Sequence, residues 1–324
     1  MILMANIKNK IILSLAFAAV VYIALSFWGN FGDLREVLAN FKWYYFPLLL
    51  ALAFINYLVR FAKWHYYLKI LKIKIPKMES FKIFLAGFSM SITPGKLGEV
   101  LKSYLLKDKY QIPISKTAMI VFADRLTDMV ALIVISAVGV FGYNFGKTYI
   151  WIISAVVLLI IILIEFRPVA ERILRALTKL KFLKKRAQKL ENLYESSYEM
   201  IRPKHLAVAS LISIFAWSCE CLGLYLTFIA FDFKTGVLAA FFIYAFSTIL
   251  GAITMLPGGL GATEGTMTGL TILLGIPKGI SAAATIIIRA ATLWFAVIIG
   301  VVALLIVNKG NDTHRNISPI GHRR

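Results

Sequence analysis

The chain has 324 residues, of which 60% are hydrophobic, and its mean hydropathy is +0.78. A soluble domain averages about 45–50% apolar residues, so the composition excludes an ordinary soluble globular protein. Lys and Arg total 36 against 16 Asp and Glu, a formal net charge of +20. In a membrane protein this excess is expected in cytoplasmic loops, and nucleic-acid binding is not predicted.

Long apolar runs follow one another along the chain, many of them close to the roughly 20 residues that a membrane-spanning helix needs. The first run ends without a small-x-small cleavage site, which favours a retained helix over a signal peptide. The sequence therefore predicts an all-α polytopic membrane protein. The runs lie at 11–28, 44–61, 79–92, 117–143, 149–165, 205–231, 237–255 and 266–307, and the last divides at Gly275–Lys278.

The distribution of Lys and Arg between the loops predicts the orientation. Segments 60–78 and 166–204 and the tail beyond 308 are basic, whereas loops 29–43 and 144–148 are nearly neutral. Because basic loops stay inside, the first three are expected in the cytoplasm of a cell-membrane protein, together with both chain termini.

The connector 166–204 mixes apolar residues at helical spacing with its Lys and Arg residues. That pattern is typical of an amphipathic segment on the inner membrane surface. An ordinary connecting hairpin of helices is the alternative.

The predicted orientation can be tested by thiol labelling in intact cells. Cysteines introduced by Ile70→Cys and Leu180→Cys should be shielded from a membrane-impermeant reagent, whereas Gly146→Cys should react, because the basic loops are placed inside. Labelling at position 70 from outside would reverse the orientation.

Two of the apolar segments are interrupted by glycine and proline. Segment 79–106 breaks at Thr93–Glu99, and both of its flanks are expected in the cytoplasm, so it is predicted to be a re-entrant hairpin. Segment 237–275 breaks at Leu256–Glu264 and would enter from the opposite face. Irregular backbone at membrane depth is tolerated only inside protein or against a wet cavity.

The two breaks carry a repeated motif. PGKLG at 94–98 recurs as PGGLG at 257–261, and a glutamate follows each motif. Arg125 and Arg289 then follow the two motifs at nearly the same spacing. This favours inverted repeats, 44–143 and 205–307, each with a broken hairpin, as in secondary transporters whose site lies where the broken segments meet. Two unrelated turns are the alternative.

These halves define a single transmembrane domain, 1–310, followed by a basic cytoplasmic tail, 311–324. Ionisable residues at membrane depth are costly and usually functional, so the breaks and the charged residues near them form the candidate head-group site. The candidate residues are Pro94, Gly95, Lys96, Gly98, Glu99, Asp124, Arg125, Asp128, Pro257, Gly258, Gly259, Gly261, Glu264 and Arg289. Lys102 and Glu220 also lie at membrane depth.

An anion such as phosphate is the predicted ligand, since glycine-rich helix starts present backbone N–H groups. Thr93 before Pro94 has the form of an N-cap. Lys96, Arg125 and Arg289 would supply countercharge.

The acidic residues suggest pairing. Arg125 and Asp128 share a helix face, whereas Asp124 and Asp128 would repel each other unless a cation lies between them. The glutamates are expected to cap helices, pair with bases or take up protons. A structural ion-pair network is the alternative to a binding site.

Neither catalysis nor a metal or other cofactor is predicted. No extramembrane stretch can hold an enzyme domain, and neither a Walker loop nor a zinc-protease helix is present. Cys219 and Cys221 are one residue apart, which suits neither a disulfide framework nor a tetrahedral metal site, and the four histidines are scattered.

Three segments carry a family resemblance: TPGKLGEVLKSYLL at 93–106, ADRLTD at 123–128 and LPGGLGATEGTMTGLTIL at 256–273. They resemble the flippase-like membrane domain of a family of multi-pass proteins, which is similar to the transmembrane region of lysylphosphatidylglycerol synthases. The resemblance covers nearly the whole chain and implies movement of a lipid or lipid-linked molecule between leaflets. The soluble aminoacyl-transferase domain of those synthases is missing here, so lipid lysylation by this chain alone is not expected.

The sequence is compatible with three functions. The first is a flippase-like transporter without ATPase machinery, acting on a membrane phospholipid or a lipid-linked anionic molecule. The second is a membrane subunit that docks a separate soluble glycosyl- or aminoacyl-transferase through its basic inner surface. The third, an intramembrane enzyme acting on polyprenyl phosphates, has the least support.

Overall fold

The computed structural model describes residues 19–21, 23, 31–93, 99–140, 152, 155, 199–200 and 202–316, and these residues form helices and connecting turns with no strand. Three helical stretches among them are long and apolar enough to cross a membrane. The all-α membrane class is therefore confirmed. These stretches are Trp43–Ile70, Pro203–Ala230 and Lys278–Lys309.

Several sequence predictions fall outside the described residues: most of the runs 11–28 and 149–165, the loop 144–148, nearly all of the connector 166–204, and positions 94–98 of the first break.

The described elements are α2 (Phe31–Ala39), η1 (Trp43–Tyr45), α3 (Phe46–Ile70), α4 (Lys77–Ala86), η2 (Gly87–Met90), α5 (Leu101–Tyr110), α6 (Ile114–Gly139), α11 (Pro203–Ala230), α12 (Val237–Ile253), η5 (Pro257–Gly259), α13 (Ala262–Leu273), α14 (Lys278–Arg289), the π-helical segment η6 (Ala290–Trp294) and α15 (Phe295–Asn316).

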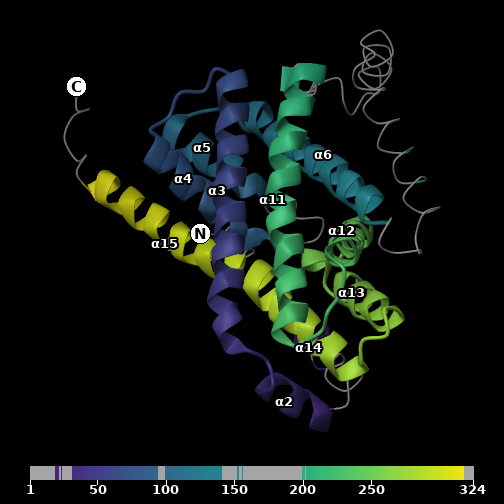
Figure 1. Ribbon diagram of the computed structural model, residues 1–324. Coiled ribbons are helices and arrows are strands. Elements are labelled where there is room, and N and C mark those ends of the chain that lie inside the picture. Colours follow the sequence, from purple (N-terminus) through teal and green to yellow (C-terminus); the bar gives the residue numbers. More distant parts are fainter. Residues whose placement is uncertain are drawn as a thin grey trace, which may run out of the picture.

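Helices α3 and α11 lie side by side at the centre and run in opposite directions (Figure 1). At one end Tyr66 of α3 hydrogen-bonds His205 of α11, with 2.6 Å between Oη and Nδ1. At the other end Lys42, just before α3, forms an ion pair with Asp232, just after α11. Both helices contain a proline in their first turn, where its missing N–H costs nothing.

Both glycine-rich segments are interrupted, the first of them from Gly87, six residues before the predicted break at Thr93–Glu99, most of which lies outside the described residues. Between α4 and α5 the chain leaves the α-helix at Gly87, and between α12 and α13 it leaves it after Ile253. Within the second break Gly258, Gly259 and Gly261 have φ of +62°, +69° and +85°. Only glycine adopts such angles without steric cost, so the composition of this motif follows from its backbone.

The two halves pack reciprocally, because α6 of the first packs on α12 of the second and α15 of the second packs on α4 of the first. The closing turns of α3 and α11 also match. Lys72 and Asp232 both have positive φ, and in each turn the N–H of the next residue bonds a carbonyl five residues back at 2.9 Å.

A second match precedes α6 and α14. Gln111 and Gly275 both have positive φ, and each is followed at the same spacing by a proline that immediately precedes the helix, Pro113 before α6 and Pro277 before α14. These details favour a repeat with opposite orientation of its halves. The pseudo-two-fold relation itself stays a prediction.

Gly300 allows α15 to approach η2 closely. A Cβ atom at Gly300 would lie 2.1 Å from the backbone nitrogen of Ser89 and 2.5 Å from the carbonyl carbon of Phe88. Both are backbone atoms, so the contact cannot relax by a side-chain rotation.

We therefore expect Gly300→Ala to lower the free energy of unfolding by about 1–3 kcal/mol, the range for overpacking. Thermal melting of the purified protein in detergent measures this. Gly265→Ala is the matched control, because a Cβ there meets nothing within 4 Å. Equal melting temperatures for the two variants would show that α15 does not depend on this close approach.

Candidate membrane-embedded site

A cavity of about 240 Å³ lies near the middle of the two central helices. Tyr57 of α3 and Trp217 of α11 line it, and both sit close to the midpoints of their helices. Ser91 at the first break and Gly258 at the second also line it. The cavity therefore lies where the two interrupted segments come together.

Residues next to the two breaks pack together beside this cavity. Ile92 of the first break and Leu260 of the second are both fully buried, and they belong to one apolar cluster with Leu293 and Val297. A Cβ atom at Gly258 would lie 3.5 Å from the Cα of Ile92. The second break therefore packs closely against the segment that leads into the first.

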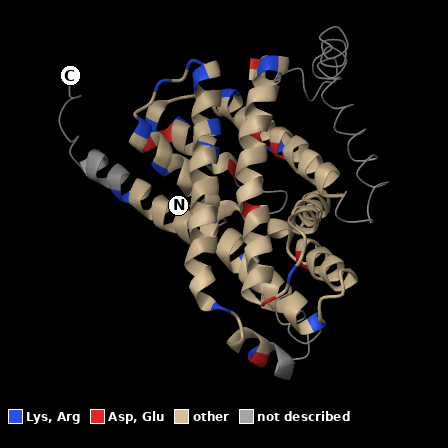
Figure 2. Cartoon of the chain, in the orientation of Figure 1, with Lys and Arg blue, Asp and Glu red and all other residues tan. Residues whose placement is uncertain are grey.

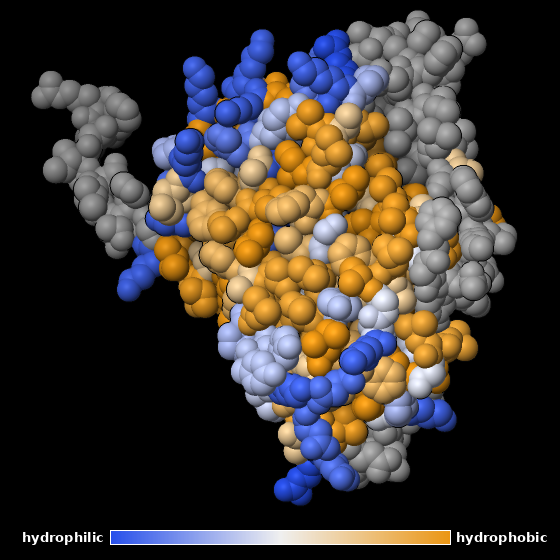
Figure 3. Space-filling view, viewed as in Figure 1, coloured by the Kyte–Doolittle hydropathy of each residue, from blue (hydrophilic) through white to orange (hydrophobic). Residues whose placement is uncertain are grey.

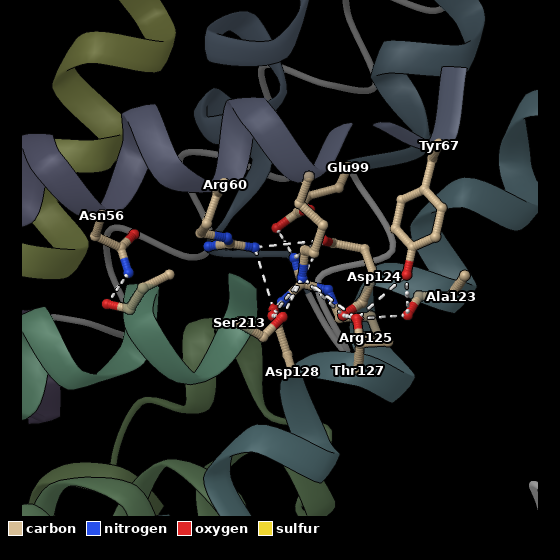
Figure 4. Close-up of polar contacts among 12 residues, drawn as sticks. Asn56, Arg60, Tyr67, Glu99, Ala123, Asp124, Arg125, Thr127, Asp128 and Ser213 are labelled. Carbon is tan, nitrogen blue, oxygen red and sulfur yellow. Dashed lines mark hydrogen bonds and ion pairs between the residues drawn. The ribbon is translucent and has the colours of Figure 1, made fainter. Parts of the chain in front are cut away.

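Two basic residues of α3 pair with two aspartates of α6. Lys63 Nζ lies 2.6 Å from Asp124 Oδ1 and 2.7 Å from Asp128 Oδ1. Arg60 Nη2 lies 3.2 Å and 3.3 Å from the Oδ2 atoms of the same aspartates. The cations expected between the two aspartates therefore come from α3 (Figure 4).

The assignment of Arg60 and Lys63 to a cytoplasmic loop is wrong. Helix α3 continues to Ile70, well beyond the predicted run, and Lys63 is fully buried while Arg60 is 7% exposed. The signal was available: the two bases are three residues apart and so share a helix face, as the two aspartates four residues apart do.

Arg60 also contacts the aromatic wall of the cavity. Its Cζ atom lies 5.7 Å from the centroid of the Phe88 ring and 5.9 Å from that of Trp217. Such cation–π contacts are stronger where water is excluded. They hold the guanidinium group at the cavity surface.

Glu99, which follows the first break, is 1% exposed and pairs with two bases. Arg125 Nη2 donates to its Oε1, and Lys102 Nζ lies 3.3 Å from its Oε2. The Nζ of Lys102 also lies 5.0 Å from the centroid of Trp64. Glu99 thus ties the segment after the break to α6.

The predicted pair of Arg125 and Asp128 is present but is not the closest contact of either residue. Arg125 Nη1 is 3.7 Å from Asp128 Oδ2, and Arg125 Nη2 is also 3.7 Å from Asp124 Oδ2. The Arg125 side chain is 26% exposed, and it lines the cavity together with Arg60, Glu99 and Asp128.

The second break is clamped by Arg289. Its Nε donates to Glu264 Oε1 at 2.6 Å, and its Nη2 donates to the carbonyl oxygen of Gly258 at 2.9 Å. Glu264 is fully buried, and its Oε2 accepts the N–H of Gly261 at 2.7 Å. Glu264 thus both caps α13 and pairs with the arginine, two of the roles expected for the glutamates.

At the first break the hydroxyl of Thr93 donates back to the carbonyl of Met90 at 2.7 Å. The helix start that Thr93 was predicted to cap falls within 94–98, outside the described residues, so the N-cap stays a prediction. Pro257 and Gly259 form η5 together with Gly258. The predicted site residues Pro94, Gly95, Lys96 and Gly98 lie outside the described part of the chain.

A further acid on α11 faces the same cavity. Glu220 is 7% exposed, and Tyr244 Oη donates to its Oε2 at 2.6 Å. Within the described residues, the membrane-embedded site contains five bases and five acids, so their formal charges balance. These are Arg60, Lys63, Lys102, Arg125 and Arg289, with Glu99, Asp124, Asp128, Glu220 and Glu264.

Many of the charged residues outside the site lie at the end of the molecule where α3 ends and α11 begins, here called the basic end, and others, among them the pair of Lys42 and Asp232, lie at the opposite end (Figure 2). Apolar side chains dominate the middle of the surface in the same view (Figure 3). At the basic end, hydrogen bonds from Lys109 and Lys82 hold the pKa of Glu79 below its ordinary value. No group of three or more His, Cys, Asp or Glu that could hold a metal ion occurs in the described ranges.

Comparisons with known proteins agree with these features. Residues 11–300 match the family model described as the lysylphosphatidylglycerol synthase TM region. A UPF0104 membrane protein of Methanothermobacter thermautotrophicus is 26% identical over 302 residues, covering 84% of this chain and 88% of the relative. UPF0104 membrane protein MJ1078 of Methanocaldococcus jannaschii is 27% identical over 229 residues, 68% of this chain and 95% of the relative.

Proposed function

Because the chain belongs to the family of the lysylphosphatidylglycerol synthase transmembrane region, we propose that it moves a phospholipid or a lipid-linked anionic molecule between the leaflets of the cell membrane. The observation that carries the proposal is the cavity near the helix midpoints, which is bordered by both breaks and by three arginines, Arg60, Arg125 and Arg289. A charged head group needs such a polar environment to cross the hydrocarbon core.

The arrangement of the breaks supports a transport role. In secondary transporters, discontinuous helices from two inverted halves meet at a midplane site. Here Ile92 and Leu260, one from each interrupted segment, belong to one apolar cluster with Leu293, which lines the cavity. Arginine binds phosphate well, so the anionic part of the lipid is the part that the cavity would hold. No catalytic step is included in the proposal.

Filling the cavity should stop transport. Thr248 lines the cavity, and its hydroxyl donates to the carbonyl of Tyr244, one turn back in the same helix, at 2.8 Å. We expect Thr248→Trp to slow translocation at least about tenfold, because an indole would occupy the space of the head group. The measurement is liposome reconstitution with a lipid whose head group is labelled in one leaflet only.

The matched control is Leu211→Trp, which places the same indole on α11 at a position that is 66% exposed. This variant should translocate lipid at the rate of the unaltered protein. Equal rates for the two tryptophan variants, or no translocation above protein-free liposomes by the unaltered protein, would refute the proposed transport.

The basic end favours one alternative, a membrane subunit that docks a soluble glycosyl- or aminoacyl-transferase. Lys69, Lys72, Lys74 and Lys77 are exposed there, around the end of α3 and the start of α4. Such a surface would attract an acidic partner domain as well as anionic lipid. Co-purification of a soluble transferase that is lost when these lysines are replaced by glutamine would favour this function.

A further inference from the structure

The ion pairs that link α3, α5 and α6 contain one more base than acid. The bases are Arg60, Lys63, Lys102 and Arg125, and the acids are Glu99, Asp124 and Asp128. The pair of Glu264 and Arg289 at the second break is balanced. The members of this network that line the cavity are Arg60, Arg125, Glu99 and Asp128, two bases and two acids, so the excess base lies behind the cavity lining and the two arginines are its cavity-facing donors.

Arg60 and Arg125 approach the same two carboxylate oxygens. Arg60 Nη2 lies 3.2 Å from Asp124 Oδ2, and Arg125 Nη2 lies 3.7 Å from that same atom. The two nitrogens are therefore no more than about 7 Å apart, the sum of these distances. Since charge-assisted hydrogen bonds to phosphate are about 2.7–2.9 Å long, one phosphate group can bridge two guanidinium groups at this separation.

Both arginines also have an unused donor. The Nε of Arg60 and that of Arg125 are buried and have no hydrogen-bond partner within the described chain. In contrast, the Nε of Arg289 donates to Glu264. A buried donor left unpaired costs roughly 1–3 kcal/mol, so these two side chains are not satisfied by the described residues alone.

We propose that Arg60 and Arg125 together form the phosphate-binding element of the cavity and that its ligand is the phosphodiester of a lipid head group. This deepens the proposed function and rests on it. Arginine has five donors in a planar fork, so each side chain can keep its carboxylate contact and still donate to phosphate. Met129 and Leu132, which line the cavity on α6, supply apolar surface beside the phosphate.

The carboxylate of Glu220 opposes anion binding in the cavity. It lines the same cavity, so its negative charge disfavours a bound anion. Removing that charge with Glu220→Gln should strengthen phosphate binding, at least about threefold. If Arg60 and Arg125 serve only to hold helices together, Glu220→Gln is not expected to strengthen phosphate binding.

The test uses the full chain in detergent and two soluble probes, dioctanoyl phosphatidylglycerol and dioctanoylglycerol, which lacks the phosphate. Titration calorimetry gives the dissociation constants. We expect phosphatidylglycerol to bind and dioctanoylglycerol to bind far more weakly. Arg60→Lys and Arg125→Lys, which keep the charge but lose the fork, should each weaken phosphatidylglycerol binding about tenfold. Lys204→Gln, at an exposed position on α11, is the surface-charge control and should not change it.

Melting temperatures accompany each titration. Arg125 is partly exposed, so Arg125→Lys remains a test if Arg60→Lys does not fold. Folded lysine variants that bind phosphatidylglycerol as tightly as the unaltered protein would overturn the assignment of these arginines. Binding of inorganic phosphate without binding of phosphatidylglycerol would overturn the lipid as the source of the phosphate.

The outcomes for the site and for the function are separable. Translocation that persists in folded Arg60→Lys and Arg125→Lys proteins would refute this site and leave the flippase proposal standing. An absence of translocation by an unaltered protein that binds phosphatidylglycerol through these arginines would refute the flippase proposal and leave the site.

Discussion

Replacing Lys63 with methionine is expected to lower the free energy of unfolding by about 3–5 kcal/mol, the usual cost of leaving a buried charge without its partner. Lys63 is fully buried, and its Nζ lies within 2.7 Å of an oxygen of each aspartate. Methionine fills a similar volume without the charge, so Asp124 and Asp128 would be left with Arg60 and the more distant Arg125. Thermal or denaturant unfolding in detergent measures the loss.

Two further variants make the result specific to the ion pairs. Lys69→Met, an exposed position on the same helix, should change stability by less than about 1 kcal/mol. Adding Asp128→Asn to Lys63→Met should recover a large part of the loss, because the pair is then removed rather than broken. If Lys63→Met has the same melting temperature as Lys69→Met, or if the double variant recovers none of the lost stability, the two aspartates do not depend on Lys63.

Much of the fold could be predicted from local sequence. The apolar runs at 205–231 and 237–255 correspond closely to α11 and α12, and the division at Gly275–Lys278 separates α13 from α14. These helix boundaries depend on hydropathy and on the positions of glycine and proline within a short stretch of chain. The end of α3 could not be predicted in this way, because its last turns carry charges that are neutralised by α6, which follows only after α4 and α5.

The candidate site shows the same division between local and distant information. The sequence predicted that Asp124 and Asp128 would repel each other unless a cation lies between them. Because hydropathy assigned Arg60 and Lys63 to a loop, they were not recognised as the source of that cation. Charged residues at the end of an apolar run belong to the helix when acids of another run can pair with them.

The two PG-x-LG motifs likewise suggested one role for Arg125 and Arg289, and each arginine does pair with the glutamate that follows its motif, Glu99 or Glu264. Their further contacts differ, because Arg125 lies 3.7 Å from Asp124 and Asp128 whereas Arg289 donates to the carbonyl of Gly258.

Arg289 has the contacts of a structural residue. Its Nε donates to Glu264, which follows the second break, and its Nη2 donates to the carbonyl of Gly258 within that break, so it holds the two parts of the segment together. We therefore expect Arg289→Gln to cost about 3–5 kcal/mol of stability, since Glu264 is fully buried and would lose its countercharge. Because Arg289 also lines the cavity, the dissociation constant for phosphatidylglycerol, measured on the folded fraction, should rise, but by less than the tenfold expected for Arg60→Lys and Arg125→Lys.

A surface pair of the same residue types is the control for this prediction. Arg202 and Glu199 are 3.6 Å apart with side chains 49% and 45% exposed, so Arg202→Gln should cost no more than about 1 kcal/mol. Combining Arg289→Gln with Glu264→Gln should restore much of the lost stability, because the new amide oxygen can still accept the N–H of Gly261 while no buried charge remains. If Arg289→Gln instead keeps its stability and loses lipid binding, Arg289 is itself a ligand of the head group. The phosphate would then lie at the second break rather than between Arg60 and Arg125.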